Sequence, residues 1–104
     1  MKETEITMMR IYITEGEGKL QELLDFLKED QEVRGLTVFR GISGFGTTAH
    51  LHDAGLLDLS LDMPLVIELF DEPDKMQKIF QTLSSKVKSG HLVSWAAKMN
   101  INGK

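Results

Sequence analysis

The chain contains no cysteine, and that absence excludes several kinds of chemistry at once. Disulfide frameworks, thiol nucleophiles and cysteine-ligated zinc or iron–sulfur centres all require this side chain. Long hydrophobic runs are missing as well, so the sequence predicts no membrane-spanning helix, and the acidic start of the chain does not look like a signal peptide. We therefore expect a soluble, cytoplasmic protein that folds as a single domain over residues 1–104.

An excess of positive charge is also lacking. The 12 basic and 16 acidic side chains give a net charge of −4, which argues against general binding to nucleic acid. The distribution is uneven, because residues 1–74 hold all 16 acidic side chains, whereas residues 75–104 hold six lysines and no acid. Such a distribution can steer anions to one end of the molecule, although ordinary surface solvation accounts for it equally well.

Familiar catalytic motifs are absent too. The sequence has no Gly-x-Ser-x-Gly or His-Glu-x-x-His pattern, and the carboxylates of residues 20–30 follow the polar side of a helix. We therefore expect a protein without catalytic activity. The alternative is a small oligomeric enzyme of the ferredoxin-like type, with His50 or His52 as general base.

Apolar periodicity predicts the secondary structure. Residues 8–14, 36–42, 64–71 and 91–101 have the composition of β-strands. Leucines at positions 20, 23, 24 and 27 form one helical stripe, and a second stripe follows Pro73 and continues to a stop at Gly90. The β-α-β-β-α-β order predicts an α+β, ferredoxin-like sandwich in which two helices cover one face of a four-stranded antiparallel sheet.

Individual strands allow more detailed expectations. In the second strand, Leu36, Val38 and Ile42 are expected to share one face, and the third strand is apolar enough to lie in the interior of the sheet. The first strand is apolar on both sides, with Met9 and Met8 facing in opposite directions. Since a large apolar surface is uncommon on a monomer, we expect self-association through the sheet face that the helices leave open.

The connection between the second and third strands, residues 43–63, is much longer than an ordinary hairpin loop. Gly41 precedes this connection, and Gly44 and Gly46 lie near its start. These glycines allow backbone N–H groups to converge on an anion. The alternative is a flexible turn that leaves a strand. His50 and His52 follow, and with Asp53 they form a candidate metal site, or else a hydrogen-bonding, pH-responsive part of a subunit contact.

A second candidate anion site lies between the second helix and the last strand. Residues 84–91 contain Lys86, Lys88, three serines and a histidine, with no acidic residue among them. Ammonium and hydroxyl groups are common partners of phosphate and carboxylate. The alternative is a solvated helix end, where lysines are favoured by the helix dipole.

The middle of the chain resembles a known family. Residues 37–46 read Thr-Val-Phe-Arg-Gly-Ile-Ser-Gly-Phe-Gly, and residues 59–68 read Leu-Ser-Leu-Asp-Met-Pro-Leu-Val-Ile-Glu, with His50 and His52 between them and Asp71 beyond. This succession resembles the pattern of the uncharacterised PII-like family known as domain of unknown function 190. The resemblance extends over residues 8–101 and is looser at the first helix and the last strand.

The resemblance implies an architecture and a mode of action. It implies a homotrimer of ferredoxin-like subunits whose sheets face inward. In related PII signal proteins, small ligands, often adenine nucleotides, bind in clefts between subunits, and the connection between the second and third strands is a mobile effector loop. The implied function is regulatory, with residues 43–63 signalling to a protein partner, for which a membrane transporter is the candidate.

The resemblance also implies which residues bind a ligand. PII proteins hold nucleotide with a glycine-rich, basic loop before the last strand, to which residues 86–91 correspond here without the fuller PII motif. The expected ligand is a small anion, with a nucleotide as the first choice, and the sequence identifies no cofactor. The candidate ligand-binding residues are Arg40, Gly41, Gly44, Phe45, Gly46, His50, His52, Lys86 and Lys88.

Overall fold

The computed structural model describes residues 2–44 and 63–102 and contains the predicted order of strands and helices. Over these ranges, no helix is both long and apolar enough to cross a membrane. The described elements are strand β1 (Lys2–Thr14), the 3₁₀-helix η1 (Glu15–Glu17), helix α1 (Leu20–Asp25), its π-helical continuation η2 (Phe26–Asp30), strands β2 (Gly35–Arg40) and β3 (Pro64–Asp71), helix α2 (Pro73–Leu83) and strand β4 (Leu92–Ile101).

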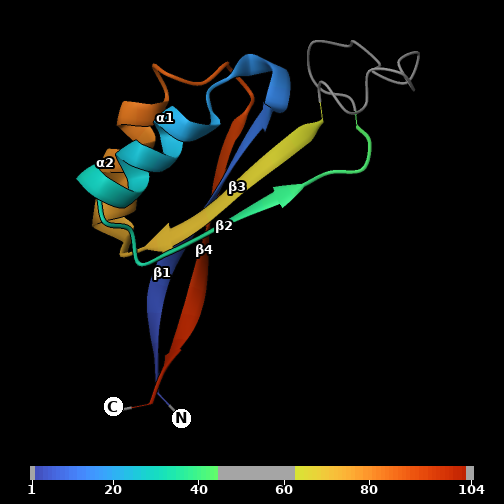
Figure 1. Ribbon diagram of the computed structural model, residues 1–104. Coiled ribbons are helices and arrows are strands. Elements are labelled where there is room, and N and C mark those ends of the chain that lie inside the picture. The colour runs from blue at the N-terminus through green and yellow to red at the C-terminus, as the bar shows by residue number, and fades with distance from the viewer. Residues whose placement is uncertain (1, 45–62, 103–104) are drawn as a thin grey trace.

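The strands form one antiparallel sheet in the order β2-β3-β1-β4. β3 lies in the interior of this sheet, as its apolar sequence predicts, and it has the predicted bounds. β1 pairs with it so that Met9 lies opposite Leu69 and Ile11 opposite Ile67. The helices lie together on one side of the sheet (Figure 1), which confirms the predicted α+β, ferredoxin-like sandwich.

The hydrophobic core lies between the helices and the sheet face that they cover. β1 and β3 contribute alternate residues to it, as the period of a strand requires, and the helices contribute the predicted apolar stripes except for Leu24. Burial of these side chains is the main contribution that favours folding. The buried core consists of Met9, Ile11, Ile13, Leu23, Leu27, Leu65, Ile67, Leu69, Met76, Ile79 and Leu83.

β1 begins at Lys2, earlier than the predicted start at Met8. Its first residues pair with the end of β4, from Lys2 opposite Ile101 onward, and the two strands form an arm that extends beyond the helices (Figure 1). Lys98 on β4 forms an ion pair with Glu3 across this arm, with 3.1 Å between Nζ and Oε2. The prediction was wrong because a two-stranded arm in water needs no apolar alternation.

α2 ends at Leu83, so the predicted stop at Gly90 was also wrong. The hydroxyl group of Ser84 donates to the carbonyl oxygen of Phe80 at 2.8 Å, alongside the helical bond from its own backbone N–H. The hydroxyl group of Ser85 donates to the carbonyl oxygen of Thr82 at 2.9 Å, where a continuing helix would place the backbone N–H of Lys86, which instead donates to Leu83 at 2.8 Å. Such side-chain bonds compete with the helical pattern and favour its end. The later lysines of the predicted helix therefore lie in the connection to β4.

β2 ends at Arg40, and this changes the position of Ile42. Leu36 and Val38 pack against the core as predicted, whereas Ile42 is 86% exposed and does not share their face. The strand ends where its pairing with β3 ends, because Arg40 lies opposite Leu65, next to the start of β3. An apolar residue beyond the last pair has no neighbouring strand to bury it.

Asp71, at the end of β3, is only 5% exposed, and its buried carboxylate accepts hydrogen bonds from several N–H groups. The backbone N–H of Arg34 and Nζ of Lys75 each donate to Oδ2 at 2.9 Å, and the backbone N–H of Glu72 donates to Oδ1 at 2.8 Å. Burial alone would raise the pKa of Asp71, but these hydrogen bonds outweigh it and lower the pKa. The carboxylate thereby joins β3, the segment before β2 and the first turn of α2.

We expect Asp71→Asn to lower the free energy of unfolding at neutral pH by about 1–3 kcal/mol, because buried donors lose a charged acceptor. The folded-state pKa of Asp71 lies below its unfolded value of about 3.9. Its contribution is therefore complete above that unfolded pKa and is lost as the pH falls through the folded pKa. Urea denaturation at neutral and acid pH should show a weaker pH dependence for Asp71→Asn than for the native chain or for Asp30→Asn, an exposed control. An equal pH dependence in all three would contradict the assignment.

Candidate functional site

The candidate residues that the structure describes lie at one end of the sheet, where β1 and β2 end and β3 and β4 begin. Backbone hydrogen bonds join these segments: Gly41 donates to the carbonyl of Pro64 at 2.7 Å, and Glu15 donates to that of Met63 at 2.9 Å. On the other side of β1, Tyr12 donates to the carbonyl of His91, also at 2.9 Å. We call this region the loop end of the sheet; it comprises residues 14–19, 40–44, 63–64 and 84–91.

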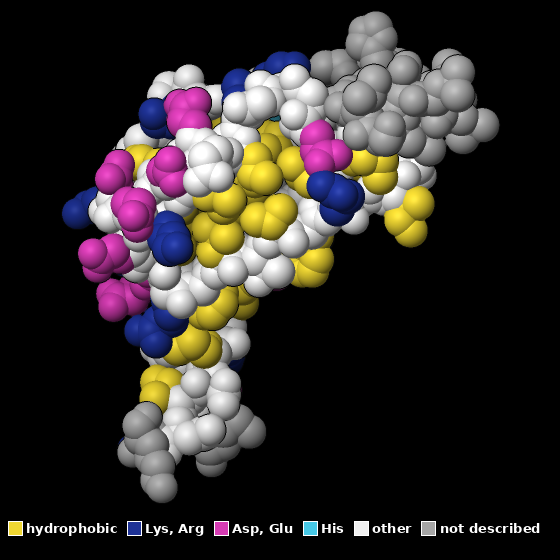
Figure 2. All heavy atoms as spheres, in the orientation of Figure 1, with side chains coloured by type: hydrophobic (Ala, Val, Ile, Leu, Met, Phe, Trp, Pro, Cys, Tyr) yellow, Lys and Arg dark blue, Asp and Glu magenta, His cyan; other side chains and the backbone are white. Residues whose placement is uncertain are grey.

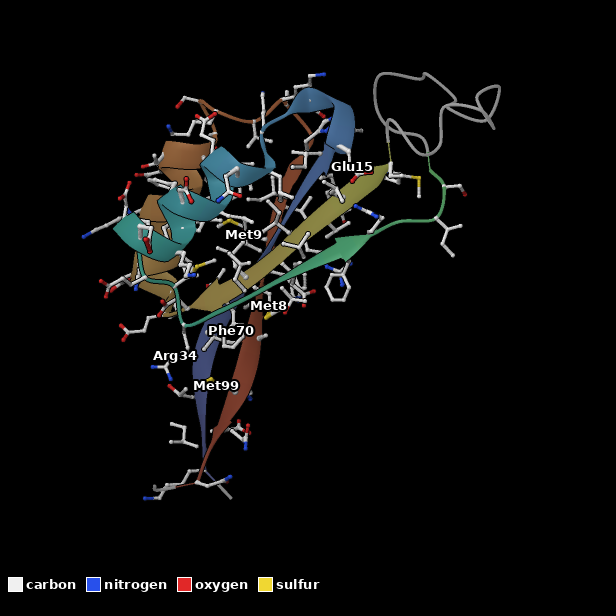
Figure 3. All side chains as sticks on the ribbon, in the orientation of Figure 1. Met8, Met9, Glu15, Arg34, Phe70 and Met99 are labelled. Carbon is white, nitrogen blue, oxygen red and sulfur yellow. The ribbon has the colours of Figure 1, made fainter. Side chains whose placement is uncertain are left out.

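Arg40, the last residue of β2, has an acidic partner at the loop end. Its guanidinium lies 2.5 Å from the carboxylate of Glu15, directly after β1, and Figure 3 shows Glu15 at this end of the sheet. The Arg40 side chain is 65% exposed, and ion pairs of this kind add little stability. An incoming phosphate or carboxylate can therefore replace Glu15 at small cost.

Gly41 has a packing role that its predicted anion-binding role did not include. A Cβ atom at this position would lie 2.8 Å from Cγ of Pro64, which is closer than real side chains come. At Gly44 the corresponding distance to the same atom is 3.8 Å, an ordinary contact. The start of the long connection therefore needs glycine at position 41 to approach β3, and position 44 has no such requirement.

A second group of polar residues lies in the connection between α2 and β4. Lys86 packs its ammonium group over the ring of Phe26, 5.6 Å from the centroid, and its carbonyl accepts a hydrogen bond from Nζ of Lys19 at 3.4 Å. The carbonyl of Lys88 accepts from the backbone N–H of His91 at 3.0 Å. Three lysines thus occur in this part of the loop end, two of them predicted and Lys19 not.

The sheet order separates these two groups within one chain. Arg40 ends β2, which is one edge of the sheet, while the lysines precede β4, which is the other edge. β3 and β1 lie between them. The single chain therefore places the two groups of candidate residues toward opposite edges of the sheet. The other candidates, Phe45, Gly46, His50, His52 and Asp53, lie outside the described residues.

The comparisons with known proteins bear on this arrangement. A model of the family DUF190, described as "Uncharacterized ACR, COG1993", matches residues 6–99. The chain belongs to this family. A UPF0166 protein of Aquifex aeolicus is 33% identical over 84 residues, which cover 76% of this chain and 79% of that protein.

Solved structures with lower sequence identity share the fold of this DUF190 chain. CPII of Thiomonas intermedia K12, solved with ADP and bicarbonate, has a TM-score of 0.65 at 16% identity over 96% of this chain and 91% of that one. The divalent ion tolerance protein CutA1 of Ehrlichia chaffeensis has a TM-score of 0.60 at 13% identity, over 94% and 85%. The DUF190 chain accordingly has the PII-like, ferredoxin-like fold that the resemblance implied, and CutA1 shares this fold.

Sequence reasoning missed two residues of the loop end. Glu15 and Lys19 lie in a short segment whose glycines indicated only a break after the first strand. Their partners, Arg40 and Lys86, follow 25 and 67 positions later, and no local pattern reveals pairs at such a separation. Residues 1–74 carry a net negative charge, so the charge distribution does not single out a lysine in that part of the chain.

We expect Gly41→Ala to lower the free energy of unfolding by about 1–3 kcal/mol, because the added methyl group collides with the rigid ring of Pro64. Gly44→Ala is the matched control, and it should change stability by less than about 0.5 kcal/mol, since its Cβ finds ordinary contact distance. Thermal and urea denaturation of both variants measure this difference. Equal effects of the two substitutions would show that the close approach at Gly41 is not a constraint.

Proposed function

We propose that this DUF190 chain is a non-catalytic, PII-like regulatory protein. In this proposal it folds as a single domain, assembles as a homotrimer and binds a small anion, with a nucleotide as the first choice, in the clefts between subunits. Occupancy of the cleft is passed through residues 43–63 to a protein partner, for which a membrane transporter is the candidate. CPII, which shares the fold, was solved with ADP and bicarbonate, and this supports the choice of ligands to test.

The observation that carries the proposal is the separation of the two partial sites. Arg40 and the lysine pair Lys86 and Lys88 lie toward opposite edges of the same sheet, at the same end. When subunits are arranged in a ring, one edge of each sheet comes next to the other edge of its neighbour. A cleft between subunits would then hold arginine from one copy and lysines from the next, which suits a ligand with several negative charges.

The charge distribution supports this placement. The exposed acids Glu22, Asp25, Glu29 and Asp30 lie on α1 and η2, and Figure 2 shows Asp and Glu side chains gathered over the helical layer. Residues 84–91 contain no acid. The electrostatic potential around residues 84–91 is therefore favourable for an anion, although the whole chain carries a charge of −4.

Glu15 connects ligand binding to the long connection in this proposal. Its carboxylate pairs with Arg40, just before that connection, and its backbone N–H donates to the carbonyl of Met63, the last residue of the connection. An anion that forms an ion pair with Arg40 displaces the Glu15 carboxylate from the guanidinium group. The exchange therefore acts next to both ends of residues 43–63.

We expect ADP to raise the thermal unfolding temperature of the native chain, because a ligand that binds only the folded state stabilises it by about 2.7 kcal/mol at 100 times its Kd. Lys86→Ala/Lys88→Ala should abolish this rise, whereas Lys78→Ala/Lys98→Ala, which removes two lysines elsewhere, should retain it. The screen includes ATP, AMP, cyclic nucleotides, bicarbonate and divalent metals.

Two other outcomes would contradict the proposal. A rise with ADP that is the same in both double variants would place the nucleotide elsewhere. A rise with divalent metals alone, lost in His50→Ala/His52→Ala, would instead support a metal site that includes these histidines and Asp53.

A further inference from the structure

The arm formed by the start of β1 and the end of β4 has one strand edge that the sheet leaves open. β1 pairs with β4 from Lys2 onward, but its pairing with β3 begins only at Thr7, which lies opposite Asp71. Figure 1 shows β3 ending beside the helices while β1 and β4 continue beyond them. Over Lys2–Ile6, β1 therefore has β4 on one side and, among the described strands, no neighbour on the other. We call this open side the arm edge.

The hydrogen-bond pattern of β1 shows which backbone groups point out of the arm edge. The N–H of Tyr12 donates to the carbonyl of His91, next to the start of β4, and the register with β4 then runs unbroken to Lys2. Successive residues of a strand direct their N–H and C=O groups to opposite sides. Even-numbered residues of β1 therefore bond to β4, and Glu3 and Glu5 direct their backbone groups out of the arm edge.

The chain itself leaves the sheet before it reaches this edge. After Asp71, the backbone N–H of Glu72 donates to the Asp71 carboxylate at 2.8 Å, and Pro73 then begins α2. Proline has no N–H, and its fixed φ suits the first turn of a helix. The position in line with β3, beside Glu3 and Glu5, is thus open to an extended segment from outside this sheet.

The side chains along the arm edge favour a basic segment. Glu3 and Glu5 have the parity of Met9, so their carboxylates lie on the helix side of the sheet, and both residues are exposed. Glu72, directly after β3, adds an exposed acid at the inner end of this position. Lys98 pairs with Glu3 from the β4 side at 3.1 Å, but such an exposed pair adds little stability. Lysine or arginine on an added strand would therefore lie opposite available carboxylates.

The same acids disfavour a second copy of the arm as the occupant. Antiparallel pairing of two identical strands about a two-fold axis places residues of equal parity opposite each other. With the axis at Glu3, Thr4 or Glu5, a glutamate of one copy lies opposite a glutamate of the other, and like charges in that position are destabilising. A basic strand meets no such penalty, so the charges distinguish it from another copy of this chain.

We propose that the arm edge binds an extended, basic segment of another protein, which adds a strand to the sheet beside Glu3 and Glu5. In such complexes main-chain bonds provide affinity and alternate side chains provide specificity. The segment has lysine or arginine at every second position, opposite the carboxylates, and apolar residues between them, beside Thr4 and Ile6. The arm edge lies at the other end of the sheet from the loop end, so this contact is separate from the proposed ligand site and from residues 43–63.

The probe is a fluorescein-labelled peptide, Thr-Lys-Val-Lys-Val-Lys-Thr, titrated with the full chain and followed by fluorescence polarisation. In an antiparallel strand the lysines opposite Glu3 and Glu5 supply the backbone bonds to β1, and the valines direct theirs outward. N-methylation of the lysine backbone nitrogens should therefore weaken binding about 10-fold or more, although the charge is unchanged. N-methylation of the valine nitrogens is the matched control and should retain binding.

Charge reversal tests the role of the acids. Glu3→Lys/Glu5→Lys should weaken binding of the basic peptide about 10-fold or more and should admit the acidic peptide Thr-Glu-Val-Glu-Val-Glu-Thr instead. Glu22→Lys/Glu29→Lys makes the same change of charge at exposed positions of the helical layer and should keep the native preference. Circular dichroism establishes that both variants fold.

Hydrogen exchange followed by NMR locates the added strand in the native chain. The peptide should slow exchange of the Glu3 and Glu5 amides and should affect Thr4 and Ile6 far less, since their N–H groups already point to β4. No binding, equal binding of the lysine-methylated peptide, or unchanged Glu3 and Glu5 amides would overturn the inference. Protection of these two amides without any peptide would show that another copy of the chain already covers the edge, and would overturn it as well.

Discussion

Two helical segments can cover only one face of a four-stranded antiparallel sheet. In this DUF190 chain the core lies under the helices, and the opposite face presents tyrosine, phenylalanine, valine and tryptophan to solvent. Apolar surface in water raises the free energy of the isolated chain, and association removes that penalty. The Arg10–Glu68 ion pair lies within this surface and joins β1 to β3.

The same sheet determines what a ligand site requires. Antiparallel pairing brings the ends of β1 and β2 and the starts of β3 and β4 to one end, and the β2-β3-β1-β4 order places Arg40 and the α2–β4 connection toward opposite edges. Assembly and ligand binding are therefore linked in our account. In the proposed homotrimer, one sheet edge of each subunit would lie next to the other edge of its neighbour. In the single chain, the carboxylate of Glu15 forms an ion pair with Arg40, the residue to which we propose that an external anion binds.

The sequence predicts the fold well where the signal is local and poorly where it depends on distant partners. The apolar run of β3 and the leucine stripe of α1 identify these elements because burial imposes its own period. The start of β1 at Lys2 depends on pairing with β4, at the other end of the chain. Likewise, the Glu15–Arg40 pair and the Lys19 contact with Lys86 join segments that no short pattern connects.

The most direct test of the account mixes two binding-deficient variants. Arg40→Ala retains both lysines, Lys86→Ala/Lys88→Ala retains the arginine, and neither should bind ADP alone. If each cleft takes arginine from one subunit and lysines from its neighbour, refolding an equal mixture should restore ADP binding in about one quarter of the clefts. Calorimetry gives that stoichiometry. Mixed trimers that form but recover no binding would place both partial sites within one chain, and would contradict the account.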